Sequence, residues 1–130
     1  RVPLPWEGDE PPFGFGCSAE RSWLPVPAEW RSLTREVQER DPDSTLSLYK
    51  KALRLRRELL LPAEDALHWA DAPQNVLAFR REPGFTCAVN FGADPVTLPF
   101  EGEVVLSSGP VEQDGTHLVL PGDTAVWLRQ

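Results

Sequence analysis

Residues 75–91, with the sequence NVLAFRREPGFTCAVNF, contain two strand-forming runs separated by a turn. The runs Asn75–Arg81 and Phe85–Phe91 flank Glu82-Pro83-Gly84, and a Pro-Gly pair between two such runs is typical of a turn. Every second residue of the second run is apolar, so these side chains would share one face of a strand. The stretch therefore predicts an antiparallel hairpin, with Cys87 as a core residue rather than a reactive thiol.

Four further strand candidates follow this hairpin at short intervals: Pro95–Phe100, Glu103–Ser107, Thr116–Leu120 and Asp123–Arg129. Short strands separated by turn residues are typical of a small β-sandwich. We therefore predict an all-β antiparallel sandwich domain over residues 73–130. A domain of this size buries a smaller fraction of its surface than a larger domain does, so we expect it to pack against other parts of the protein.

The middle of the chain predicts two helices. The first covers Ala28–Arg40, and the second covers about residues 42–60. Asp41 would cap the second helix, and Pro42 would occupy its first position, where the missing N–H costs nothing. Apolar residues cover half of this helix, and Arg56 lies near the middle of the apolar half, which predicts a buried ion pair.

The first thirty residues are rich in proline and tryptophan. They hold six of the 14 prolines and three of the five tryptophans. Proline excludes a regular helix or a central strand, whereas a disordered linker would be poor in aromatic residues, so we expect a long ordered loop. Trp6 could stack on a sugar ring or pack within the loop, and for Trp23 and Trp30 we favour packing.

Composition narrows the possible functions. The chain has 13 basic and 20 acidic residues and a net charge of −7, which disfavours binding to nucleic acid. No apolar run approaches the ~18 residues of a membrane helix. The two cysteines and two histidines lack metal or triad spacing, so we predict no metal and no cofactor, and we expect free thiols and a cytoplasmic protein.

No catalytic residue is assigned within the chain. Three carboxylate pairs lack any accompanying catalytic motif: Asp9/Glu10, Asp41/Asp43 and Glu64/Asp65. Methionine is absent and the chain begins at Arg1, which predicts that a leader or a larger upstream part has been removed.

Short motifs follow one another along the whole chain: Arg1-Val2-Pro3-Leu4-Pro5-Trp6-Glu7, Gly14-Phe15, Trp23-Leu24-Pro25, Val37-Gln38, Asp41-Pro42-Asp43-Ser44, Tyr49, Leu53-Arg54-Leu55-Arg56, Leu77-Ala78-Phe79-Arg80-Arg81, Val89-Asn90-Phe91 and Leu120-Pro121. In order and spacing they resemble the C-terminal part of α-glucosidases, of the oligo-1,6-glucosidase type, in the α-amylase superfamily of glycoside hydrolases.

The resemblance implies a (β/α)₈ barrel followed by a β-sandwich, with retaining cleavage of α-glucosidic bonds by carboxylates upstream of this chain. Residues 1–72 would be the last loop and terminal helix of the barrel. Active sites of such barrels lie at the loop face, so the resemblance makes Arg1 a contact at the rim of the sugar pocket, with Trp6 as the second candidate for substrate binding. The partners would be the missing barrel and an α-glucoside or maltooligosaccharide.

The alternative is a free-standing module that binds carbohydrate or another protein. Such a module would close its own core, whereas a piece of a larger enzyme would leave the apolar face of the 42–60 helix exposed.

Overall fold

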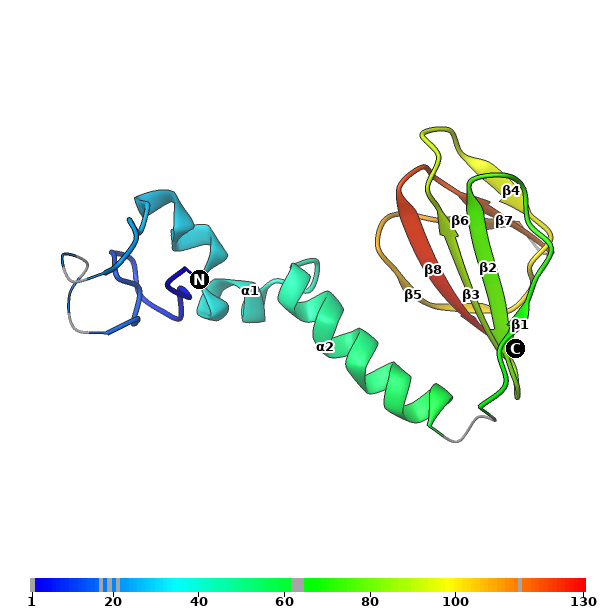
Figure 1. Cartoon of the computed structure of the whole chain (residues 1–130), viewed down its shortest axis with the longest axis horizontal. Helices are drawn as coiled ribbons and strands as arrows, with labels where there is room; N and C mark the ends of the chain where they lie inside the picture. The colour runs from blue at the N-terminus through cyan, green and yellow to red at the C-terminus, as the bar shows by residue number, and fades with distance from the viewer. Residues whose placement is uncertain (1, 17, 19, 21, 62–64, 115) are drawn as a thin grey trace. The chain divides into compact units, whose positions relative to one another are not determined.

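The computed structural model describes residues 2–16, 18, 20, 22–61, 65–114 and 116–130 of the 130-residue chain. These residues belong to two compact units, Arg1–Lys50 and Lys51–Gln130 (Figure 1). Across the described ranges, no helix combines the length and apolar character needed to cross a membrane.

The helix predicted over Ala28–Arg40 is two helices. A 3₁₀ helix covers Ala28–Leu33, and α1 covers Arg35–Arg40. Thr34 separates them with an extended backbone, and its Oγ1 accepts a hydrogen bond from the N–H of Val37 at 3.3 Å. A residue that caps α1 in this way cannot also continue the preceding helix, so the prediction of one continuous helix is wrong.

Helix α2 covers Thr45–Leu55 and begins later than predicted. The capping side chain is Ser44, whose Oγ accepts a hydrogen bond from the N–H of Ser47 at 3.2 Å. Asp41 instead accepts the N–H of Asp43 at 2.9 Å, which forms a turn before the helix. A single π-helical turn, Arg56–Leu60, continues α2 at its C-terminal end.

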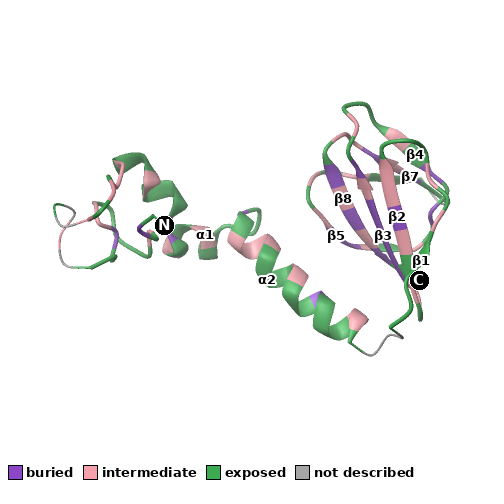
Figure 2. Cartoon of the chain, viewed as in Figure 1, coloured by how far each residue is buried: buried purple, intermediate pink, exposed green. Residues whose placement is uncertain are grey.

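The apolar face of α2 is largely exposed. Tyr49 is 63% exposed and Leu53 is 53% exposed, and among the residues of α2, all of which are described, only Leu55 is buried (Figure 2). Arg56 is also exposed and forms no ion pair with any described residue, so the predicted buried ion pair is wrong for this chain. The guanidinium stays hydrated because no described segment covers this face.

Described residues from 65 onward form two antiparallel sheets. The first has the order β1-β2-β3-β8-β5, and the second has the order β4-β7-β6. The strands are β1 His68–Trp69, β2 Val76–Arg81, β3 Phe85–Asn90, β4 Val96–Leu98, β5 Glu103–Ser107, β6 Glu112–Asp114, β7 His117–Leu120 and β8 Thr124–Arg129. The six predicted strands and the all-β sandwich are confirmed. Strands β1 and β6 were not predicted, because one has two residues and the other is wholly polar.

The main core lies between the two sheets. Its buried members come from both: Ala78, Ala88, Leu98, Phe100, Leu118, Leu120, Val126 and Leu128. Asn90 is 1% exposed beside this core, and its amide donates to the carbonyl oxygens of Asp94, Leu120 and Pro121 at 2.9–3.2 Å. This buried amide therefore holds the two turns at one end of the sandwich together.

The opposite face of the larger sheet carries an apolar row across all five strands. Strand register places Trp69, Phe79, Cys87, Trp127 and Leu106 side by side. Cys87 is 6% exposed, which confirms it as a buried residue, and burial raises the pKa of its thiol to about 11. Strand β3 is therefore buried on both faces.

Candidate functional site

The N-terminal loop folds around one aromatic side chain, Phe13. The backbone N–H groups of Trp6 and Glu7 donate to the carbonyl oxygen of Phe13 at 2.8 and 3.1 Å. The N–H of Phe13 donates to the carbonyl of Glu10 at 2.9 Å, and the residue is 0% exposed. Phe13 thus fixes the backbone of the Trp6 candidate, a role that the sequence analysis missed.

The same loop is attached to α1. The N–H groups of Arg35 and Glu36 donate to the carbonyl oxygens of Pro5 and Trp6, both at 3.0 Å. The first N–H groups of a helix have no partner within the helix, so the loop supplies acceptors that α1 lacks. Trp6 is therefore held through its N–H by Phe13 and through its carbonyl by α1.

Gly14 allows the loop to close. Its φ is +72°, and a Cβ atom there would lie 3.1 Å from Cγ of Glu7 and 3.4 Å from Cβ of Trp6. Any other residue would combine a strained backbone with a tight contact. The Gly14-Phe15 motif therefore has a structural reason in this chain.

The Trp6 side chain lines an apolar pocket of about 430 Å³. The indole is 43% exposed, and the other apolar walls include Leu4, Leu33, Leu46 and Tyr49. This places Trp6 beside α1 and the start of α2. Arg1, the other predicted substrate contact, lies outside the described residues.

Two polar side chains that line this pocket, Arg35 and Gln38, already have partners within the chain. Arg35 lies 2.5 Å from a carboxylate oxygen of Glu39. The side-chain amide of Gln38 donates to the carbonyl of Leu33 at 2.8 Å and accepts the N–H of Leu46 at 3.2 Å. A sugar site needs polar groups that point at the ligand, so the pocket favours an apolar protein surface instead.

One member of each carboxylate pair considered for acid–base chemistry has a partner in the structure. Asp9 forms an exposed ion pair with Arg31 at 2.7 Å, and Asp41 accepts a backbone N–H in the turn before α2. Asp65 lies 3.7 Å from an arginine of β2, and Glu64 lies outside the described residues. In the described part of the chain, no group of three or more potential ligands could hold a metal ion.

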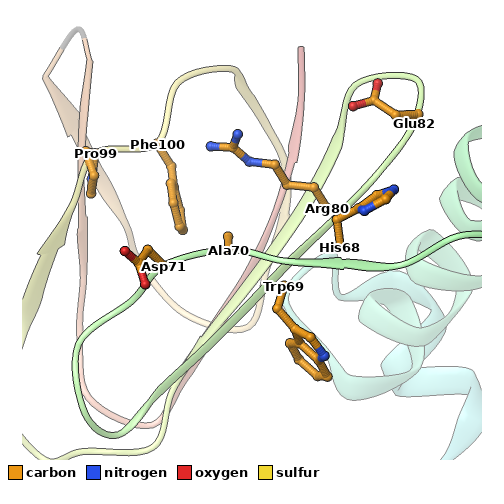
Figure 3. A pocket seen from close by; sticks show the side chains of 8 residues that line it. All are labelled: His68, Trp69, Ala70, Asp71, Arg80, Glu82, Pro99 and Phe100. Carbon is orange, nitrogen blue, oxygen red and sulfur yellow. The ribbon is translucent and has the colours of Figure 1, made fainter.

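A second pocket, of about 490 Å³, opens at the β1 edge of the sandwich (Figure 3). Four ionisable side chains line it over an apolar floor: His68, Asp71, Arg80 and Glu82, with Pro99 and Phe100 beneath. In the sequence, His68 lacks metal or triad spacing, so nothing marks it as a site residue. The β1–β2 pairing brings it opposite Arg80, and β1 is too short to be predicted.

Comparison with known proteins gives matches along the whole chain. The family model described as "Domain of unknown function (DUF3459)" matches residues 62–127. The salivary alpha-glucosidase of Aedes aegypti is 28% identical, and the match covers 99% of this chain and 25% of that protein.

Solved structures with the same fold are also similar. The alpha-glucosyl transfer enzyme XgtA has a TM-score of 0.67 and 32% identity, over 97% of this chain and 24% of that one. Isomaltulose synthase from Klebsiella sp. LX3 has a TM-score of 0.74 and 24% identity, and the match covers 98% of this chain and 24% of that one. The chain thus spans about a quarter of the length of the relatives it matches.

Proposed function

The chain belongs to the DUF3459 family, and we propose that it acts as the C-terminal part of an α-glucosidase that cleaves α-glucosidic bonds with retention of configuration. The matches confirm the resemblance to the C-terminal part of such an enzyme. In this proposal the chain supplies a rim loop and structural support, and the catalytic carboxylates belong to the barrel. The substrates would be α-glucosides or maltooligosaccharides, cleaved in the cytoplasm.

The observation that carries this proposal is the apolar surface that the first unit leaves uncovered. The pocket beside Trp6 is open, and Tyr49 on its wall is 63% exposed. Leu33, on another wall, is 53% exposed. Contiguous exposed apolar side chains mark a surface that another protein part covers, which favours the enzyme piece over a free-standing module.

The loop around Phe13 supports a role at the rim of a sugar pocket. Hydrogen bonds on both sides of Trp6 give the loop a defined backbone without contacts from a ligand. A pre-formed loop loses little conformational freedom when a substrate binds. In our proposal this loop presents Arg1 toward the substrate, and Trp6 is the second candidate for a substrate contact.

Activity of the chain by itself is the direct test. We expect no release of nitrophenol from a nitrophenyl α-glucoside, because the proposed catalytic carboxylates lie outside the chain. Turnover above background that disappears in Asp9→Asn or Glu10→Gln would contradict the proposal. Retained turnover in Glu101→Gln, an exposed carboxylate of the sandwich, would show that the loss is specific.

Oligomeric state and saccharide binding in solution distinguish the enzyme piece from the alternative, a free-standing binding module. A free-standing module would be a monomer that binds maltooligosaccharide through Trp6, and Trp6→Ala would abolish that binding. The enzyme piece would instead expose apolar surface, which we expect to appear as self-association in sedimentation velocity. Weaker self-association in Tyr49→Ser and Leu53→Ser would assign it to the face of α2.

A further inference from the structure

We propose that the pocket at the β1 edge of the sandwich binds a short neutral saccharide. This inference goes beyond the proposed function, which assigns no ligand to the sandwich domain. The pocket is built by β1, the turn after β2 and the segment after β4, all within one compact unit (Figure 3).

Strand pairing sets the direction of the key side chains. His68 and Arg80 are register partners, so their side chains lie on the same face of the sheet. Ala78 lies two residues from Arg80 on β2 and belongs to the main core, so this face is the one that meets the second sheet. Arg80 therefore projects toward the opening between the sheets.

The floor of the pocket is aromatic. The guanidinium carbon of Arg80 lies 5.7 Å from the centroid of the Phe100 ring, and Phe100 is 3% exposed. This contact places the guanidinium over the ring, and both residues line the pocket. Figure 3 shows Arg80 extending toward Phe100, whereas the ring of Trp69 points away from both.

The four ionisable side chains keep unused hydrogen-bonding capacity. Within the described ranges, His68, Asp71, Arg80 and Glu82 form no ion pair and no side-chain hydrogen bond with one another or with other described residues. All four are exposed to solvent. Polar groups that line one pocket and have no internal partners are available to a ligand.

The charges indicate which ligand fits. The two carboxylates that line the pocket outnumber its single guanidinium, so an anion is disfavoured. Carboxylates accept hydrogen bonds, whereas guanidinium and imidazole donate them. Sugar hydroxyls donate and accept, and the exposed Pro99 offers an apolar surface against which a sugar ring can pack. The volume suits a small ligand, because ligand pockets measure roughly 300–1,000 Å³.

NMR titration of the ¹⁵N-labelled full chain tests the site. Maltotriose is the first probe, a choice of linkage that rests on the proposed function, and cellotriose and inorganic phosphate are the others. We expect saturable shifts of the amides of His68, Asp71, Arg80 and Glu82 with a saccharide, and none with phosphate. Absence of such shifts with both saccharides at about 50 mM would overturn the inference, as would saturable binding of phosphate alone.

The NMR titration tests only the pocket at the β1 edge. The proposed function is tested separately, by turnover of the nitrophenyl α-glucoside and by self-association through the face of α2, so failure of one proposal is distinguishable from failure of the other. Binding of cellotriose without maltotriose would support the pocket and separate it from α-glucosides.

Two variants locate the binding. Arg80→Gln and Asp71→Asn each remove a charged hydrogen-bonding partner, so we expect affinity to fall at least about tenfold. Arg129→Gln, at an exposed arginine of β8, is the matched control and should bind as the original chain does. Asp71 lies on the surface, so its variant keeps the test valid even if Arg80→Gln disturbs Phe100. Unchanged affinity in Asp71→Asn and in a folded Arg80→Gln variant would overturn the assignment.

Discussion

Replacing Phe13 by alanine should release the N-terminal loop from α1. The ring is 0% exposed, and a buried aromatic side chain covers about 150–250 Å². At about 25 cal/mol per Å², its burial contributes at most about 4–6 kcal/mol, and measured Phe-to-Ala losses are about 3–5 kcal/mol. We therefore expect Phe13→Ala to destabilise the first unit by about 3 kcal/mol or more.

Amide hydrogen exchange measures this loss of stability at the hydrogen bonds that connect the loop and α1. The N–H groups of Trp6 and Glu7 donate to Phe13, and those of Arg35 and Glu36 donate to the loop. A loss of about 3 kcal/mol corresponds to exchange more than about a hundredfold faster, or to complete loss of protection if the unit is less stable than that.

The control lies two residues away in the same loop. Phe15 is 44% exposed, so Phe15→Ala should change the exchange of these amides by much less than tenfold. Unchanged protection of Trp6 and Glu7 in Phe13→Ala would refute the view that Phe13 holds the loop. Equal effects of the two substitutions would refute it as well.

Three further predictions concern single residues. Gly122→Ala should prevent stable folding of the sandwich, because the new Cβ atom would lie 2.3 Å from a carbonyl oxygen. Gly109→Ala is the control: its new Cβ atom would come no closer than 3.5 Å to another atom, so the melting temperature should change little. The hydrogen bond and charge of Lys50, followed by the charge of Arg35, lower the pKa of Glu39. The ionised Glu39 side chain therefore stabilises the fold above the usual pKa of glutamate, and this stabilisation is lost as pH falls through the lowered pKa. Glu39→Gln should remove this step from the pH dependence of unfolding. Burial raises the pKa of Cys87 to about 11, so a thiol reagent at pH 8 should label it only after denaturation. The Cys17→Ser variant keeps Cys87 as its single thiol, and rapid labelling of this variant in the folded state would contradict the prediction.

Alternation of apolar residues was enough to predict most of the sandwich. It identified the hairpin around Pro83 and four later strands, because those strands bury at least one face. It missed β6, whose three residues are all exposed, so that the strand carries no apolar alternation. The start of α2 was also misplaced, because Asp41 and Ser44 are both good caps and only the structure decides which one accepts an N–H from the first turn of the helix.

The candidate sites were harder to predict because they depend on contacts between distant residues. Trp6 stood out as an aromatic residue in a proline-rich loop, but nothing local marked Phe13 as its support. The pocket at the β1 edge joins His68 to Arg80 through a strand of two residues. A pattern of that length carries no signal, so the polar residues of this pocket looked unrelated in the sequence.

Attachment of the N-terminal loop to α1 has a consequence for how such loops can diverge. Both anchors of Trp6 come from residues 2–16 and from the first turn of α1, and no described residue between Gly16 and Ala28 takes part in them. We expect that substitutions of the described residues in that interval would not remove a partner from either anchor. The position of the Trp6 backbone therefore depends on the loop around Phe13 and on the first turn of α1, which separates change in that interval from the place of the tryptophan.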